Sequence, residues 1–215
     1  MNTKEIREYK KTLRLSKRQR DIIVGLLLGD GHLETQDNGR TYRLKVEHGM
    51  HQEDYTKWLY SEFKDWIPAG AMYKKVRIGG QESTGFTTYS HGALRFYGKA
   101  FYDADNVKRI PKTIKKLIKP IGVAVWFMDD GSRKSSKHKT YNIHTLGYTK
   151  KELVILQEVL TEVFSIETKL HSQKGKYWRM YIPSHSATKF TELIGAYVKP
   201  IASMQKKLVT TTPKK

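Results

Sequence analysis

Ile22-Ile23-Val24-Gly25-Leu26-Leu27-Leu28-Gly29-Asp30-Gly31 is the stretch around which this chain is built. A second stretch of the same design follows, Ile121-Gly122-Val123-Ala124-Val125-Trp126-Phe127-Met128-Asp129-Asp130-Gly131. Ser16 and Gln19 form a capping-box pattern that predicts a helix start before the first stretch. A glycine just past the last apolar residue favours a helix end. The sequence therefore predicts two helices that each end in Asp-Gly.

Both predicted helices are apolar on nearly every side, so both must be buried. Gly25 and Gly29 lie four residues apart and would let another backbone approach closely. If the helices pack together, Asp30 and Asp130 come side by side, each at the helix end where the dipole disfavours an acid. Such carboxylates repel, and one would keep its proton unless divalent cations bridged them to a phosphate. The alternative is two buried helices that happen to end in Asp-Gly.

Composition points to a polyanionic partner. The 215 residues suffice for one large domain or two small ones, and the net charge is +19. The absence of cysteine excludes disulfides and cysteine-ligated zinc. No apolar run reaches the roughly 20 residues of a membrane span, and no secretory signal is visible. We expect nucleic acid as a partner and no membrane.

The order of elements repeats after the second stretch. Ser90–Phe96 matches Ser184–Phe190, and each segment follows a strand and opens a helix. This predicts an α+β fold in which an αββαββα unit is used twice. The first unit comprises a helix over 17–29, strands 32–36 and 41–48, a helix over 51–66, strands 72–78 and 85–89, and a helix over 90–101. The second comprises a helix ending at 130, a basic loop 131–139, a strand 141–146, a helix 149–164, strands 165–172 and 176–182, and a helix 184–197.

Four segments follow from this pattern. Residues 1–15 form a basic arm, 16–102 the first half, 103–119 a basic connector with a short helix from Lys112, and 120–215 the second half. Along 41–48 apolar and charged side chains alternate, which is typical of a half-buried strand. Its basic face suits a sheet laid in a DNA major groove, although an ordinary solvated sheet face is the alternative.

Ile23–Gly31 and Val123–Gly131 resemble the nine-residue motif of the LAGLIDADG homing endonucleases, in the single-chain type found in mitochondrial group I introns. The resemblance covers about residues 16–210. It implies that the motif helices form the interface between two pseudo-symmetric halves, whose sheets make a β-saddle over double-stranded DNA. It also implies a monomer that cleaves both strands at a long, nearly asymmetric site.

The resemblance assigns the metal site to the last acid of each motif, Asp30 and Asp130, next to Gly29 and Asp129. These would hold two or three Mg²⁺ (or Mn²⁺) ions shared between the two active sites. Asp129 has Gly29 as its counterpart, which favours a structural role for this acid.

Three further residues match catalytic positions of the family. Lys108 precedes Ile-Pro in the connector, and Lys207 lies in a Met-x-x-Lys-Leu stretch; the alternative for both is an ordinary phosphate contact. Glu47 matches an active-site acid or amide on the second strand, with His144 or Thr145 as its unlike counterpart. The histidines show no metal-ligand spacing, and His48 and His51 are interpreted as surface or cap residues.

The side chains predicted to contact DNA come from strand faces, turns, the connector and the loop after the second motif. They are Arg40, Arg43, Lys45, Lys75, Arg77, Lys112, Arg133, Lys134, Lys169, Tyr177, Arg179 and Tyr181.

Two other functions remain open: an RNA-splicing maturase that binds intron RNA, and a DNA-binding regulator of the same fold with inactive sites. The compartment is open as well. We expect a mitochondrion or chloroplast if the gene is organellar, and otherwise a bacterial or phage cytoplasm.

Overall fold

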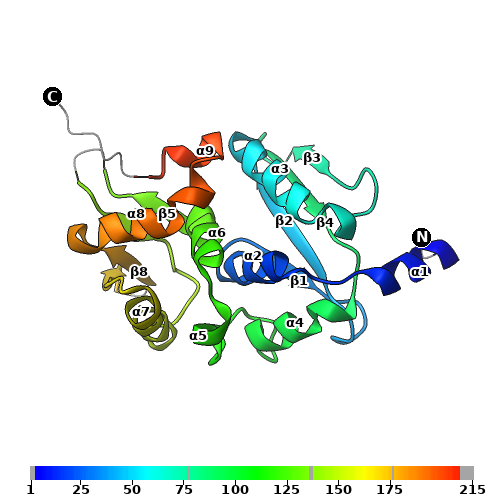
Figure 1. Ribbon diagram of the computed structural model, residues 1–215, viewed down its shortest axis with the longest axis horizontal. Coiled ribbons are helices and arrows are strands. Elements are labelled where there is room, and N and C mark those ends of the chain that lie inside the picture. The colour runs from blue at the N-terminus through cyan, green and yellow to red at the C-terminus, as the bar shows by residue number, and fades with distance from the viewer. Residues whose placement is uncertain (1–2, 77, 136–137, 176, 209–215) are drawn as a thin grey trace.

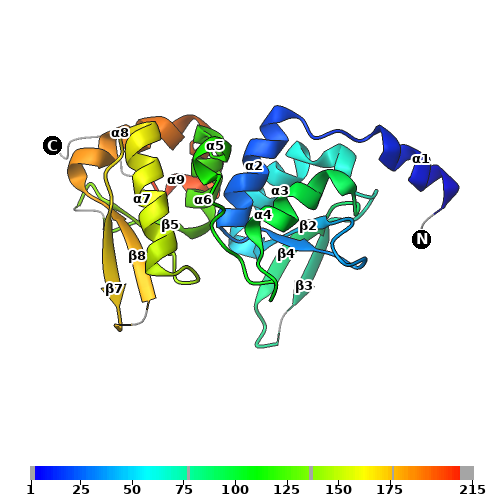
Figure 2. The same ribbon diagram turned by 90° about the horizontal axis from the view of Figure 1, so that it is seen from below.

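The computed structural model describes residues 3–76, 78–135, 138–175 and 177–208. Two halves lie side by side, and each consists of a four-stranded antiparallel sheet with helices over one of its faces (Figures 1 and 2). The motif helices α2 (Lys17–Leu28) and α6 (Pro120–Asp130) stand between the two sheets. The hairpins of the sheets project to the side away from the helices (Figure 2).

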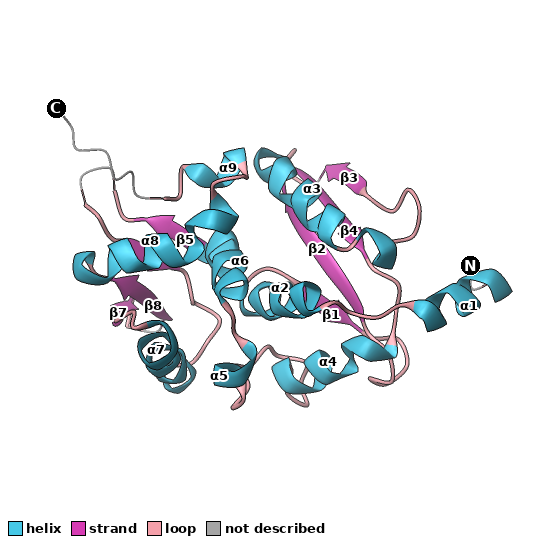
Figure 3. Ribbon diagram, in the orientation of Figure 1, coloured by secondary structure: helices cyan, strands magenta, loops and turns pink. Residues whose placement is uncertain are grey.

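Each half has the predicted order α-β-β-α-β-β-α, and the sheets have the equivalent strand orders β1-β2-β4-β3 and β5-β6-β8-β7. The predicted α+β fold and its internal repeat are therefore confirmed (Figure 3). The first half contains α2, β1 (His32–Glu34), β2 (Arg43–Gly49), α3 (Glu53–Glu62), β3 (Tyr73–Val76), β4 (Glu82–Thr87) and α4 (Arg95–Phe101). The second contains α6, β5 (Gly131–Arg133), β6 (Tyr141–Ile143), α7 (Lys150–Phe164), β7 (Lys169–Gln173), β8 (Tyr177–Ile182) and α8 (Ser184–Val198). Outside the repeat lie α1 (Lys4–Thr12), α5 (Ile114–Leu117) and α9 (Ala202–Gln205).

Apart from shifted element bounds, the structure departs from the predicted elements in three places. A strand, β5, occupies the start of the segment predicted as a basic loop over 131–139. The helix predicted over 51–66 is α3 flanked by short 3₁₀ turns at Met50–Gln52 and Lys64–Trp66. The helix α9 was not predicted. These pieces are three or four residues long, too short to show a periodicity of their own.

The seam between the halves is a close crossing of α2 and α6. A Cβ atom on Gly25 would lie 2.3 Å from the carbonyl oxygen of Gly122, and one on Gly122 would lie 2.9 Å from that of Asp21. The whole run Ile22–Leu28 is buried. The backbones therefore touch where the glycines stand, and the two motif helices end next to each other.

The described residues contain no helix with the length and apolarity needed to cross a membrane.

Candidate active site at the helix seam

The seam gathers three carboxyl groups at the ends of the motif helices. Burial, reinforced by the charges of Asp129 and Asp30, raises the pKa of Asp130 to about 8. Burial and then the charge of Asp129 also raise the pKa of Asp30. This arrangement agrees with the expectation that the acids of the two motifs cannot all ionise when no cation is bound.

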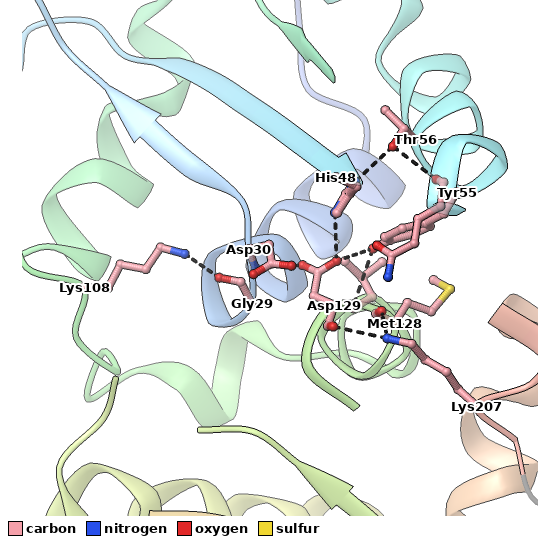
Figure 4. Close-up of polar contacts among 11 residues, drawn as sticks. Gly29, Asp30, His48, Tyr55, Thr56, Lys108, Met128, Asp129 and Lys207 are labelled. Atoms are coloured by element: carbon pink, nitrogen blue, oxygen red, sulfur yellow. Dashed lines mark hydrogen bonds and ion pairs between the residues drawn. The ribbon is translucent and has the colours of Figure 1, made fainter. Parts of the chain in front are cut away.

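Two lysines approach these acids from opposite sides (Figure 4). The Lys108 ammonium donates to the carbonyl oxygen of Gly29 at 2.5 Å. The Lys207 ammonium donates to the carbonyl oxygens of Met128 at 2.5 Å and Asp129 at 3.2 Å. Each lysine thus donates hydrogen bonds to backbone carbonyl groups at the end of one motif helix. Gly29 and Asp129, which accept them, are equivalent positions of the two motifs. Burial lowers the pKa of both ammonium groups, and the nearby acids oppose this shift.

Asp129 is the centre of a buried polar cluster. Its Oδ1 accepts a hydrogen bond from the Tyr55 hydroxyl at 2.8 Å, and its Oδ2 accepts one from the Asp30 amide at 3.0 Å. The His48 Nε2 lies 3.4 Å from the same Oδ1. The interpretation of His48 as a surface or cap residue is wrong, since the residue is only 4% exposed.

The sequence did contain a signal for His48. Leu44 and Val46 are the buried positions of β2, and His48 is the next one in the same alternation. The helical spacing of Tyr55 indicated a core aromatic, and the ring is indeed buried. That its hydroxyl reaches an acid of the other half follows only from the packing of the halves.

Glu47 lies beside the acids on the open face of the first sheet. It accepts hydrogen bonds from the Tyr73 hydroxyl at 3.0 Å and the Ser83 hydroxyl at 3.2 Å, and pairs with Lys75 at 2.6 Å. The strand registers make His144 its counterpart, because β1–β2 and β5–β6 pair equivalently. A cavity of about 580 Å³ joins Glu47 to the motif end; it is lined by Asp30, His32, Lys45, Glu47, His48, Gly49, Gln52 and Lys75.

The open sheet faces carry most of the predicted DNA contacts. On the first sheet, Arg43 and Lys45 both pair with Glu34, at 2.8 and 3.4 Å. On the second, Arg179 donates to the Gln173 side chain at 2.8 Å, and the Lys134 ammonium lies 5.5 Å from the centre of the Tyr181 ring. Lys169 is the register partner of Tyr181, and the exposed Tyr177 lies on the same face.

Three predicted DNA contacts lie elsewhere. Arg133 pairs in register with the fully buried Tyr141, which places it on the helix-covered face. The exposed Lys112 precedes α5, which lies on the side of the molecule opposite the hairpin tips (Figure 2). Arg40 is exposed in the connection between β1 and β2. Arg77 is outside the described residues.

The donor atoms at the seam suit a hard divalent cation. Carboxylate and carbonyl oxygens, which Mg²⁺ prefers, come from Asp30, Asp130, Gly29 and Asp129. Within the described residues, Asp30, His48 and Asp129 offer ligand atoms that all lie within 4.8 Å of one another. Both side-chain oxygens of Asp129 already accept hydrogen bonds, from the Tyr55 hydroxyl and the Asp30 amide.

Comparison with known proteins agrees with this geometry. The chain is 28% identical over 200 residues to the DNA endonuclease I-ChuI of Chlamydomonas applanata, covering 86% of this chain and 92% of that protein. It is 24% identical over 200 residues to the cytochrome b mRNA maturase bI2 of Saccharomyces cerevisiae, covering 87% of this chain and 46% of that protein. The homing endonuclease I-WcaI bound to its DNA recognition sequence superposes with a TM-score of 0.87 and 26% identity, over 98% of this chain and 95% of that one.

The model of the LAGLIDADG DNA endonuclease family matches residues 20–190, which include both motifs, both sheets and the connector. Since this match extends over most of the sequence and both motifs end in an acid at the seam, the chain belongs to the LAGLIDADG DNA endonuclease family.

Proposed function

We propose that the protein is a monomeric homing endonuclease that hydrolyses both strands of duplex DNA at a long, nearly asymmetric site. The observation that carries this proposal is that Asp30 and Asp130 lie close together at the seam. One lysine ammonium is hydrogen-bonded to the backbone at the end of each motif. A DNA-binding regulator of the same fold that does not cleave DNA would not require two acids and two lysines at this place.

Each residue has a distinct part in the proposed reaction. Asp30 and Asp130 would hold two or three Mg²⁺ or Mn²⁺ ions, which, when bound, activate water and stabilise the leaving oxygen. Lys108 and Lys207 place positive charge at the motif ends, where the phosphate carries its negative charge. Glu47 faces the same cavity as Asp30 and is suited to accept a proton from attacking water in the first half.

Binding is assigned to the open faces of the two sheets. Their strands present Arg43 and Lys45 in one half and Arg179 and Tyr181 in the other, on the face that the helices leave uncovered. Because the halves share a fold but differ in these side chains, they read different sequences, which gives a target that is not a palindrome.

The test is incubation of the purified chain with DNA that carries the candidate insertion site. We expect linear product with Mg²⁺ or Mn²⁺ and intact DNA with EDTA. Specific binding without cleavage under all conditions would instead identify a DNA-binding regulator.

RNA splicing is a second candidate function, favoured by the likeness to the maturase and by a groove on the helical side. This groove, of about 610 Å³, is lined by Leu13, Arg14, Leu15, Arg20, His91, Ala93, Phe96, Tyr97 and Leu117. Phe96 is 53% exposed and can stack on an unpaired base, while the two arginines can contact phosphates. If RNA binds there, Phe96→Ala weakens binding of the intron transcript and leaves DNA cleavage unchanged.

A further inference from the structure

Asp129 links two halves of the molecule through a carboxylate that has no contact with solvent. Its side chain is 0% exposed, and it belongs to α6 of the second half. The groups that surround it come from the first half: the Tyr55 hydroxyl from α3, the His48 imidazole from β2 and the Asp30 amide at the end of the first motif (Figure 4).

The groups around Asp129 are themselves fixed. The Thr56 hydroxyl donates to the carbonyl oxygen of Gln52 at 3.3 Å and lies 3.1 Å from the His48 Nδ1. This contact directs the other ring nitrogen, Nε2, toward Asp129. Tyr55 and His48 also pack together, with ring centroids 4.9 Å apart. The position of the carboxylate is therefore set by packing as well as by hydrogen bonds.

The two motif acids need different support. The helix α6 runs through Asp130, so the helix itself holds the backbone of this residue. The helix α2 ends at Leu28, and Gly29 has φ −105° and ψ −133°, which is not helical. The amide of Asp30 therefore lies beyond its helix, and the Asp129 carboxylate supplies the acceptor for it.

Within the described residues this cluster has no counterpart in the other half. The residue equivalent to Asp129 is Gly29, and a Cβ atom there would lie 2.4 Å from the Asp129 Oδ2, so one carboxylate excludes the other. The residue equivalent to His48 in the strand register is Thr145, whose hydroxyl donates to the carbonyl oxygen of Trp178 in its own half. Across the seam, the Tyr148 hydroxyl donates to the carbonyl oxygens of Leu27 and Leu28, and no hydrogen bond joins it to an acid.

We propose that Asp129, hydrogen-bonded by Tyr55 and packed beside His48, is a positioning residue that fixes Asp30, and that this one-sided support makes the two strand cleavages unequal. The proposal rests on the proposed endonuclease function. Without the cluster, the backbone of Asp30 is no longer fixed, whereas Asp130 is still held by its helix. Loss of the cluster therefore slows cleavage of one strand more than cleavage of the other.

The test compares Tyr55→Phe with the matched control Tyr148→Phe. Both variants delete a hydroxyl that crosses the seam, but only the first hydroxyl touches Asp129. The rate of nicking is measured for each strand, with the strands labelled separately. We expect Tyr55→Phe to slow one strand by roughly tenfold or more relative to the other, as is usual for groups that orient a catalytic carboxylate. Tyr148→Phe should keep the wild-type ratio of the two rates.

A second readout uses the metal-free protein and no cleavage. Hydrogen exchange of the Asp30 amide, followed by NMR, should accelerate in Tyr55→Phe and in His48→Ala but not in Tyr148→Phe. Equal slowing of both strands in Tyr55→Phe, or unchanged exchange of the Asp30 amide, would overturn the positioning role. If the wild-type protein cuts neither strand, the proposed function fails, whereas the exchange experiment still reports on the cluster.

Discussion

At the scale of single residues, the proposed reaction depends on two acids, and neither can take the place of the other. Asp30 and Asp130 come from different helices, and each is the terminal acid of its motif. We expect Asp30→Asn and Asp130→Asn each to abolish double-strand cleavage and to keep specific DNA binding, because binding is assigned to the sheets. Cleavage and gel-shift assays on the same target check this, with the exposed Asp105→Asn as the control. Wild-type cleavage by either seam variant would contradict the metal assignment.

The lysines give a second prediction at this scale. Lys108 is hydrogen-bonded to the end of the first motif and Lys207 to the end of the second. Only the second motif has a further carboxylate, that of Asp129, next to its terminal acid. We therefore expect Lys108→Ala and Lys207→Ala to slow cleavage to different extents, with a nicked intermediate accumulating in at least one variant. Strand-resolved kinetics measure this. Unchanged cleavage rates in both variants would mean that the two lysines only contact phosphates and have no part in catalysis.

The raised pKa of Asp130 predicts how the metal-free protein responds to pH. Its value of about 8 lies above the 3.8 of an unperturbed Asp, so the folded state binds this proton more tightly than the unfolded state. The stability contributed by the protonated form is complete below pH 4 and is lost as the pH rises through 8. Urea unfolding in EDTA at pH 5.5 and 8.5 should show a smaller loss in Asp130→Asn than in the wild type. Equal losses would mean that Asp130 does not titrate in this range.

At the scale of elements, the crossing of α2 and α6 sets the distance between the acids. Gly25→Ala places a methyl group 2.3 Å from a backbone oxygen, which no side-chain rotation can relieve. We expect a loss of about 1–3 kcal/mol in the free energy of unfolding, as for other overpacked cores, together with weaker cleavage because the helix ends move apart. Denaturant unfolding and cleavage kinetics measure both effects.

The matched control for this crossing is Gly195→Ala in the last turn of α8. There the nearest atom outside the local backbone is the Lys199 Cε at 3.7 Å, an ordinary contact. Alanine is the better helix former by up to about 1 kcal/mol, so this variant should be neutral or more stable. If both alanine variants unfold alike, close helix contact is not what the glycine at position 25 provides.

Local signals were enough to predict many elements. Ser16 and Gln19 form the capping box that starts α2, as predicted, because such caps depend on a few neighbouring residues. The cluster at Asp129 could not be predicted in this way. His48, Tyr55 and Asp129 are brought together by the packing of two halves, and no spacing along the chain encodes that contact.

At the scale of the whole molecule, the open sheet faces and the helical side offer two different surfaces. The open sheet faces carry bases held in place by neighbouring acids and amides, such as Arg43 beside Glu34 and Arg179 beside Gln173. The helical side has a different character, with the partly apolar groove around Phe96. A long duplex that crosses both sheets would therefore leave the groove free for another partner.

The basic side chains on the open sheet faces predict a steep dependence of DNA affinity on salt concentration. Each phosphate contact on B-DNA contributes about −0.9 to the slope of log affinity against log salt, so roughly eight contacts give about −7.

Arg179→Ala and Arg43→Ala should each relax base preference by about 1–3 kcal/mol if the guanidinium reads a guanine edge. Arg133→Ala is the matched control, because its register partner Tyr141 places it on the helix-covered face, and it should leave both slope and preference unchanged. Titrations with duplex DNA and with single-stranded RNA of matching sequence separate the possibilities. A shallow slope with duplex, or tighter binding to the RNA, would contradict a duplex lying across the two sheets and would favour splicing as the main role.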